Sequence, residues 1–100
     1  MKITVLIPVF NEVTTIKSII EKVKKNKNLD LEIIIVDDCS TDGTLQLLQE
    51  LKDEFQFKLI KNNLNKGKGF SLREGLKLAS GKIIIIQDAD LEYDPKDYTK

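Results

Sequence analysis

The sequence predicts an α/β fold in which helices cover a mostly parallel sheet. Two observations carry this prediction. Four short apolar runs, rich in valine and isoleucine, have the length of buried strands. Between them lie three segments whose apolar residues recur at helical spacing. Strands that alternate with such helices pair in parallel through right-handed crossovers, which gives a layered sheet.

The first strand is predicted at Lys2–Ile7 and ends at Pro8, which has no N–H to donate to a neighbouring strand. Asn11 is expected to cap the first helix, with Glu12 in its first turn, where a carboxylate suits the helix dipole. The buried face of this helix is predicted to comprise Val13, Ile16, Ile19, Ile20 and Val23.

A second buried strand is predicted at Leu31–Val36, followed by a helix that Ser40 or Thr41 would cap. A shorter third strand is predicted at Phe57–Ile60. The inward face of the helix between these two strands would comprise Leu45, Leu48, Leu51 and Phe55, with Leu47 beside it.

A polar, glycine-bearing loop, Lys61–Gly69, leads into a third helix that would end at Gly81. The inward residues of this helix are predicted to be Leu72, Leu76 and Ala79. The fourth strand, Ile83–Ile86, is predicted to be covered on both faces, because four consecutive β-branched residues suit a fully buried pleat. Asp94 and Pro95 then look like the start of another helix, so the chain is expected to be a fragment of a longer protein.

Composition narrows the function classes. One hundred residues suit one small domain, and 16 basic against 16 acidic side chains leave no net charge to attract nucleic acid. Histidine is absent and Cys39 is the only cysteine, which excludes a Ser-His-Asp triad and a Cys/His zinc site from these residues. A lone cysteine and an N-terminus without a signal-peptide pattern predict a cytoplasmic protein.

The polar residues that follow the predicted strands should meet at one edge of the sheet, because ligands of open parallel sheets bind at the carboxyl ends of the strands. Carboxylates would hold a cation there, and lysines would offset the charge of phosphates. The pattern therefore favours a metal-bound, phosphate-bearing ligand. The residues concerned are Pro8, Phe10, Asn11, Glu12, Asp37, Asp38, Lys66, Lys68, Asp88, Asp90 and Glu92.

Three of these acids, Asp88, Asp90 and Glu92, alternate along the chain, so an extended backbone would put them on one side. Carboxylates held together repel one another unless a cation neutralises them or some take up protons. Ligands that are all oxygen favour magnesium, manganese or calcium over zinc. An acidic, solvated loop is the alternative interpretation of this stretch taken alone.

Four segments resemble the successive motifs of family 2 glycosyltransferases: Ile7–Glu12, Val36–Thr44, Asn65–Gly69 and Asp88–Asp90. Asp88–Pro95 is similar to the corresponding segment of polyprenyl (dolichyl) phosphate mannosyl- and glucosyltransferases. The resemblance spans nearly the whole chain. It implies a three-layer α/β/α, Rossmann-like nucleotide-diphospho-sugar transferase (GT-A) fold, of which residues 1–100 would be the donor-binding part, truncated before the acceptor half.

The resemblance also implies roles for individual residues. Pro8, Phe10 and Glu12 would hold the base and ribose, and Asp38 would lie near them. The residues assigned to nucleotide-sugar binding are Pro8, Phe10, Glu12, Val36, Asp38, Lys68, Asp88 and Ala89. Those assigned to Mg²⁺ or Mn²⁺ are Asp88, Asp90 and Glu92, the last standing where related enzymes often have glutamine.

The reaction that the resemblance implies is inverting transfer of a hexose from GDP-mannose or UDP-glucose, with the metal stabilising the departing nucleoside diphosphate. The expected acceptor is a polyprenyl phosphate, which is already anionic. A hydroxyl acceptor would need a base, and that residue is expected beyond residue 100. Any membrane association, at the cytoplasmic face, would come from the same missing part.

Two other function classes remain open at this point. A signalling receiver domain is one, because Val36-Asp37-Asp38 after a strand is also an acidic phosphoacceptor pattern; acetyl phosphate would perturb a receiver only. The other is a non-catalytic nucleotide-binding module, whose nucleotide binding would persist after removal of metal.

Overall fold

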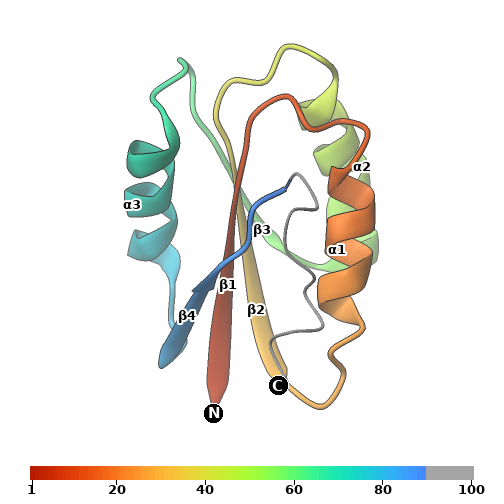
Figure 1. Ribbon diagram of the computed structural model, residues 1–100, viewed down its shortest axis with the longest axis vertical. Helices are drawn as coiled ribbons and strands as arrows, with labels where there is room; N and C mark the ends of the chain where they lie inside the picture. The colour runs from red at the N-terminus through yellow and green to blue at the C-terminus, as the bar shows by residue number, and fades with distance from the viewer. Residues whose placement is uncertain (90–100) are drawn as a thin grey trace.

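The computed structural model describes residues 1–89, and their elements follow the predicted order of alternating strands and helices (Figure 1). Asp90 and Glu92 therefore lie outside the described residues. The strands are β1 (Lys2–Val9), β2 (Asp30–Asp37), β3 (Lys58–Lys61) and β4 (Ile83–Ile86). The helices are α1 (Ile16–Lys24), α2 (Thr44–Phe55) and α3 (Lys68–Leu78).

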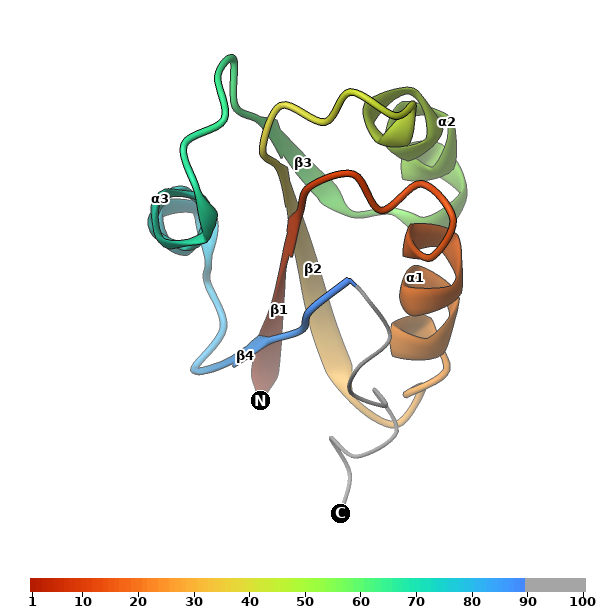
Figure 2. The ribbon, with the colours of Figure 1, turned by 45° about the horizontal axis from the view of Figure 1, so that its top comes forward.

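The four strands form one parallel sheet in the order β3-β2-β1-β4, which confirms the predicted parallel pairing. Helix α3 covers one face, and α1 and α2 cover the other, so the molecule has the three expected layers (Figures 1 and 2). Strand β1 pairs with β2 along its whole length, from Lys2 opposite Asp30 to Val9 opposite Asp37. Strand β1 can continue through Pro8, which has no backbone N–H, because the pairing with β4 already stops at Leu6. No hydrogen bond between these two strands is therefore lost at Pro8.

The two central strands alternate their side chains between the two faces, as the pleat requires. Toward α1 and α2 they send Val5, Ile7, Val9, Ile33 and Ile35, which join Ile16, Ile19, Ile20, Val23, Leu48 and Leu51 in the main core. Toward α3 they send Leu6, Ile34 and Val36, against Leu72 and Ala79. The core therefore lies on both faces of β1 and β2.

The predicted helix caps are wrong, because the polar residues proposed for them link two loops instead. Asn11 adopts a left-handed conformation (φ 53°), and α1 begins only at Ile16. The Asn11 N–H donates to Ser40 Oγ (3.0 Å), and Asn11 Oδ1 accepts the Thr41 N–H (2.7 Å). Helix α2 starts at Thr44, whose N–H is accepted by Asp42 (3.0 Å).

Gly81 is likewise not the end of α3, since the helix stops at Leu78 with Ala79 already extended. The glycine is required for another reason. A Cβ atom on it would lie 2.6 Å from both the backbone nitrogen and the Oγ1 of Thr4. No real side-chain atom approaches so closely, so the linker between α3 and β4 must carry a residue without a side chain here.

The prediction that β4 is fully buried is wrong. Ile83, Ile84 and Ile86 are each between 41% and 50% exposed. Among residues 1–89 the strand lies at an edge of the sheet, and α3 packs on β1 and β2 instead. Position in the sheet, which the isoleucine run does not encode, decides its burial.

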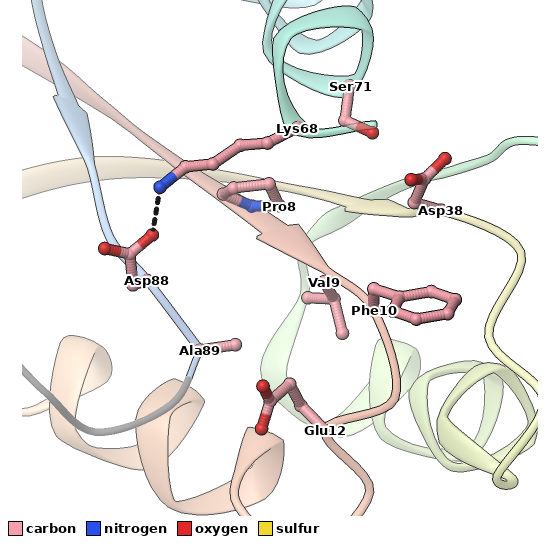
Figure 3. A pocket seen from close by; sticks show the side chains of 9 residues that line it. All are labelled: Pro8, Val9, Phe10, Glu12, Asp38, Lys68, Ser71, Asp88 and Ala89. Atoms are coloured by element: carbon pink, nitrogen blue, oxygen red, sulfur yellow. Dashed lines mark hydrogen bonds and ion pairs between the residues drawn. The ribbon is translucent and has the colours of Figure 1, made fainter. Parts of the chain in front are cut away.

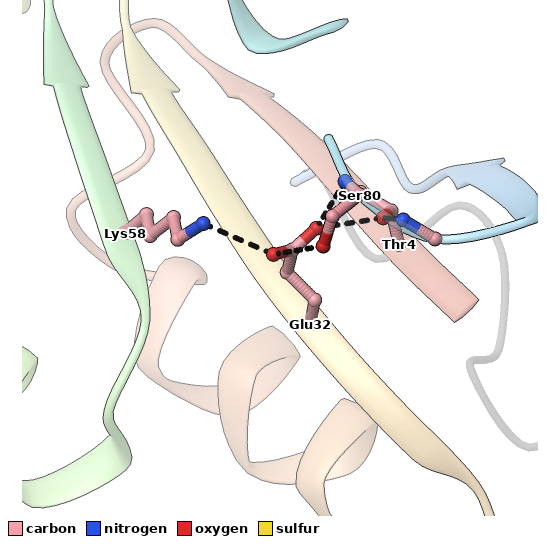
Figure 4. Close-up of polar contacts among 5 residues, drawn as sticks. Thr4, Glu32, Lys58 and Ser80 are labelled. Carbon is pink, nitrogen blue, oxygen red and sulfur yellow. Dashed lines mark hydrogen bonds and ion pairs between the residues drawn. The ribbon is translucent and has the colours of Figure 1, made fainter. Parts of the chain in front are cut away.

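Glu32 on β2 ties the start of the α3–β4 linker to the sheet (Figure 4). Its carboxylate accepts hydrogen bonds from Thr4 Oγ1 (2.8 Å), Ser80 N (2.9 Å), Ser80 Oγ (2.9 Å) and Lys58 Nζ (3.0 Å). Thr4 Oγ1 in turn accepts the Gly81 N–H at 2.9 Å. Residues from all four strands or their flanks thus meet at one carboxylate.

Between residues 1 and 89, none of the helices combines the length and the apolar character that crossing a membrane requires.

Candidate functional site

A pocket with a volume of about 180 Å³ opens at the carboxyl ends of β1, β2 and β4, the edge where the sequence predicts a ligand (Figure 3). It is lined by Pro8, Val9, Phe10, Glu12, Asp38, Lys68, Ser71, Asp88 and Ala89. Seven of the eight residues predicted to bind a nucleotide sugar are in this set. The eighth, Val36, is 2% exposed and packs beneath α3, so its nucleotide contact stays a prediction.

The β1 side of the pocket is a tight turn held by the next loop. The Glu12 N–H donates to Thr44 Oγ1 (3.0 Å), and the Val13 N–H donates to Asp42 (3.2 Å). Asp42 also accepts a short hydrogen bond from the Thr44 hydroxyl. These bonds fix the backbone that carries Glu12, whereas the Phe10 ring stays 45% exposed at the rim.

The β2 side is organised by Asp38, which is only 5% exposed. Its carboxylate accepts hydrogen bonds from the backbone N–H groups of Lys66 (2.7 Å) and Gly67 (2.8 Å) and from the Asn62 side chain (2.9 Å). Burial raises the pKa of Asp38, but these hydrogen bonds outweigh it and hold the pKa below its ordinary value. Asp38 is therefore ionised at neutral pH and anchors the loop that leads into α3.

The β4 side carries charge. Lys68, the first residue of α3, places its Nζ 2.6 Å from Asp88 Oδ1, and the two side chains face each other across the pocket in Figure 3. Ala89 is 4% exposed, and its carbonyl accepts a hydrogen bond from Thr15 Oγ1 (2.6 Å). A lysine and a carboxylate thus stand at the end of β4, next to the buried Ala89.

For the metal site, the structure describes one of the three predicted ligands. Asp88 lies at the pocket with its side chain 27% exposed. Within residues 1–89 no group of three or more acidic or cysteine side chains is arranged to hold a metal ion. The assignment of a cation to Asp88, Asp90 and Glu92 stays a prediction.

Four residues of the site were not predicted from the sequence. Val9 and Ser71 line the pocket. Ser71 follows Lys68 by three positions, about one helical turn, so the spacing could have predicted that both lie on the same side of the helix. Asn62 is 6% exposed and also donates to Ser71 Oγ (3.0 Å), joining the β2 and α3 sides. Thr15 joins the β1 and β4 sides over 74 positions of sequence, for which the sequence holds no signal.

Comparison with known proteins agrees with the fold described above. The model of the family described as glycosyl transferase family 2 matches residues 4–100. The dolichol-phosphate mannosyltransferase of Pyrococcus furiosus is 34% identical over 97 residues, which cover 96% of this chain and 28% of that protein.

Two solved structures share the fold. The mannosyltransferase PcManGT of Pyrobaculum calidifontis, in complex with GDP-Man and Mn²⁺, gives a TM-score of 0.77 at 30% identity, over 88% of this chain and 27% of its own. TarS of S. aureus, in complex with UDP-GlcNAc, gives 0.83 at 28% identity, over 99% of this chain and 29% of its own.

These similarities confirm the predicted GT-A fold. The chain spans less than a third of the length of each of these proteins. Because the family model covers almost all of its residues, the chain belongs to glycosyl transferase family 2.

Proposed function

We propose that the pocket binds a nucleotide-diphosphate sugar together with a divalent cation, and that the protein transfers the hexose to a polyprenyl phosphate. The observation that carries this proposal is the convergence at one pocket of residues from three strand ends. Glu12 comes from the β1 side, Asp38 from the β2 side, and Lys68 and Asp88 meet at the β4 side. The pocket thereby combines hydrogen-bond acceptors that suit a nucleoside with charged side chains that suit a metal-bound diphosphate.

The names of similar proteins support the donor and acceptor classes. A dolichol-phosphate mannosyltransferase and a mannosyltransferase solved in complex with GDP-Man and Mn²⁺ both resemble the chain. TarS, crystallised with UDP-GlcNAc, resembles it as well. We propose GDP-mannose or UDP-glucose as the donor, and the titration below distinguishes the two bases.

The nucleoside would lie between β1 and Asp38. The exposed Phe10 ring offers a flat apolar surface, and the Glu12 carboxylate can accept hydrogen bonds from ribose hydroxyls. Asp38 uses two acceptor positions of Oδ1 and one of Oδ2 within the protein. A carboxylate has about four such positions, so one remains on Oδ2 for a donor N–H of the base.

The diphosphate would lie between Lys68 and Asp88. Asp88 supplies the hard oxygen ligand that Mg²⁺ and Mn²⁺ prefer, so the described donor fits the predicted cation. Asp90 and Glu92 would complete the ligand set. When bound, the cation supplies Lewis-acid stabilisation of the departing diphosphate. The Lys68 ammonium, already 2.6 Å from Asp88, would offset the remaining phosphate charge.

The acceptor phosphate would attack the anomeric carbon directly and invert its configuration. A phosphate monoester is anionic at neutral pH, so this nucleophile needs little help from a base. The described residues then act by binding and orienting the donor, and the family's base for hydroxyl acceptors is not required.

Calorimetric titration of the chain with GDP, UDP, GDP-mannose and UDP-glucose, each in Mn²⁺ and in EDTA, tests the proposal. We expect Mn²⁺-dependent binding of the two ligands that share one base. Asp88→Asn should weaken the Mn²⁺-dependent binding by about tenfold or more, the usual effect of losing a charged contact. Asp53→Asn on the exposed face of α2 is the matched control and should leave binding unchanged.

Two results would contradict the proposal. One is the absence of nucleotide binding by a chain that circular dichroism shows to be folded. The other is Mn²⁺-dependent binding that survives in Asp88→Asn. The acceptor is tested separately, by the appearance of labelled sugar in the lipid phase with a polyprenyl phosphate and not with the corresponding alcohol.

A further inference from the structure

Thr15 connects the two halves of the pocket through a single hydroxyl. It lies in the turn after β1, three residues beyond Glu12, and it contacts the segment after β4. The oxygens within reach of its Oγ1 are Ala89 O at 2.6 Å, Glu12 Oε2 at 3.0 Å and Glu12 O at 3.4 Å. Neither sequence motifs nor pocket lining assigns a role to this residue.

One threonine hydroxyl carries one proton, whereas both neighbouring groups, a carbonyl and a carboxylate, are acceptors. The proton is shared between these acceptors, and the contact with Ala89 O at 2.6 Å is shorter than the one with Glu12 Oε2 at 3.0 Å. Because a carboxylate has about four acceptor positions, Glu12 keeps acceptor capacity for a ligand in the pocket. The Thr15 hydroxyl thus acts mainly on the β4 side.

The hydroxyl is diverted from the bond that its position in the helix would favour. Thr15 is the N-cap residue of α1, and a threonine there normally accepts a hydrogen bond from the N–H of the second or third helical residue. Its side chain makes no such cap bond. A local preference given up for a contact 74 positions away marks a residue that the site, and not the helix, requires.

The turn that carries Thr15 is rigidly held from the other side. Thr44 and Asp42 accept the backbone N–H groups of Glu12 and Val13. The Thr15 N–H and the Ile16 N–H both donate to Glu12 O, at 3.1 and 2.9 Å. A hydroxyl on such a turn can fix the position of the group to which it donates.

The segment that receives this bond lies just past the end of the sheet. The last backbone hydrogen bond between β1 and the β4 side in the described residues runs from Gln87 N to Leu6 O (2.9 Å). Asp88 and Ala89 follow it, beyond the register of the β1–β4 pair. Ala89 stands in the sequence between the two predicted metal ligands Asp88 and Asp90.

We propose that Thr15 is a positioning residue: by holding the Ala89 carbonyl, it sets the Asp88 carboxylate at the correct place relative to Glu12. The metal-binding end and the nucleoside-binding end of the pocket can then engage one donor molecule at the same time. This inference rests on the proposed function, because it takes Asp88 as a ligand of the cation.

The test compares Thr15→Val, which removes the hydroxyl and keeps the shape, with Thr15→Ser, which keeps the hydroxyl. Thr14→Val is the matched control, since Thr14 is exposed in the same turn and makes no hydrogen bond among the described residues. Mn²⁺ affinity without nucleotide is measured by electron paramagnetic resonance, and nucleotide affinity by calorimetry in Mn²⁺ and in EDTA.

We expect Thr15→Val to weaken Mn²⁺ binding and Mn²⁺-dependent nucleotide binding by about fivefold, the effect of one lost hydrogen bond. Nucleotide binding in EDTA should stay within about twofold, because Glu12 and Asp38 are unchanged. Thr15→Ser should restore the wild-type values, and Thr14→Val should match them. If Thr15→Val did not fold, Thr15→Ala and Thr15→Ser would provide the same comparison.

Three outcomes would overturn the inference. Equal losses in Mn²⁺ and in EDTA would show that Thr15 only stabilises the fold. Wild-type values in Thr15→Val, with a wild type that binds in a Mn²⁺-dependent manner, would refute the role of Thr15 and leave the proposed function intact. A wild type without Mn²⁺-dependent binding would refute the proposed function, and this inference with it.

Discussion

Replacing Glu32 by glutamine should destabilise the protein strongly, because this carboxylate accepts four hydrogen bonds at the start of the α3–β4 linker. Its side chain is only 10% exposed. Burial alone raises the pKa of Glu32, but the hydrogen bonds from Ser80, Lys58 and Thr4 outweigh it and lower the pKa from 4.5 to about 2. Glutamine has the same shape but presents an amide donor to groups that are themselves donors.

The size of the effect follows from the pKa. A carboxyl group whose pKa is lower in the folded state stabilises that state above its unfolded pKa. The difference between 4.5 and about 2, at about 1.4 kcal/mol for each pH unit, is about 3 kcal/mol. This stabilisation is complete above about pH 4.5 to 5 and is lost as the pH falls toward 2. Domains of this size are stable by only about 5–15 kcal/mol.

Urea unfolding followed by far-ultraviolet circular dichroism measures this difference. At pH 7 we expect Glu32→Gln to lower the free energy of unfolding by about 3 kcal/mol, which shifts the midpoint by about 1–3 M urea. Between pH 5 and pH 2 the difference from the wild type should shrink toward zero, because the protonated wild-type side chain becomes nearly equivalent to glutamine. Other carboxylates titrate in both proteins, so their contribution cancels in the comparison.

Glu50→Gln on the exposed face of α2 is the control and should follow the wild type at every pH. Curves of Glu32→Gln and the wild type that stayed parallel between pH 7 and pH 3 would show that ionised Glu32 does not stabilise the fold. A cost of Glu32→Gln below about 0.5 kcal/mol at pH 7, the range of an ordinary surface substitution, would show the same.

Two further substitutions test other parts of the structure by urea unfolding. Gly81→Ala should lower the free energy of unfolding by about 1–3 kcal/mol, because its Cβ would meet Thr4 at 2.6 Å. The control is Gly69→Ala, whose Cβ meets only Arg73 at 3.9 Å and which should be neutral or stabilising. Equal effects of the two substitutions would contradict the close approach of Gly81 to Thr4. Asn62→Ala should lower the free energy of unfolding by about 1–3 kcal/mol, because it removes the buried side chain that hydrogen-bonds both Asp38 and Ser71. The control is Asn63→Ala, at an exposed position. An effect of Asn62→Ala no larger than that of the control would show that these two hydrogen bonds contribute nothing to stability.

The order of elements and the edge at which the pocket forms could be predicted from sequence, because both follow from local patterns. Isoleucine and valine runs mark β1 and β2, and helical spacing of Ile16, Ile19, Ile20 and Val23 marks α1. Once the strands are parallel, their carboxyl ends lie at one edge, and the polar residues after them must gather there. Local pattern therefore locates the site.

The errors concern properties that depend on distant neighbours. The isoleucines of β4 read as buried, but burial depends on which strand takes the edge of the sheet. Asn11 and Ser40 read as helix caps, but each has a hydrogen-bonding partner in the other loop. Gly81 read as a helix end, but the constraint is its approach to Thr4. In each case the sequence indicates that the residue has a structural role, but a tertiary contact determines which role it is.

Hydrogen bonds hold β4, which carries Asp88 past its end, both along its pairing with β1 and at its two ends. The faces of this edge strand are largely exposed, so apolar burial holds it weakly. At its beginning, Glu32 and Thr4 hold Ser80 and Gly81; beyond its end, Thr15 holds Ala89 and Lys68 holds Asp88. Hydrogen bonds have directional geometry, whereas apolar contacts tolerate sliding. A short strand fixed by directed bonds at both ends can place a carboxylate accurately without a large buried surface, and this is why polar residues far from the pocket contribute to its geometry.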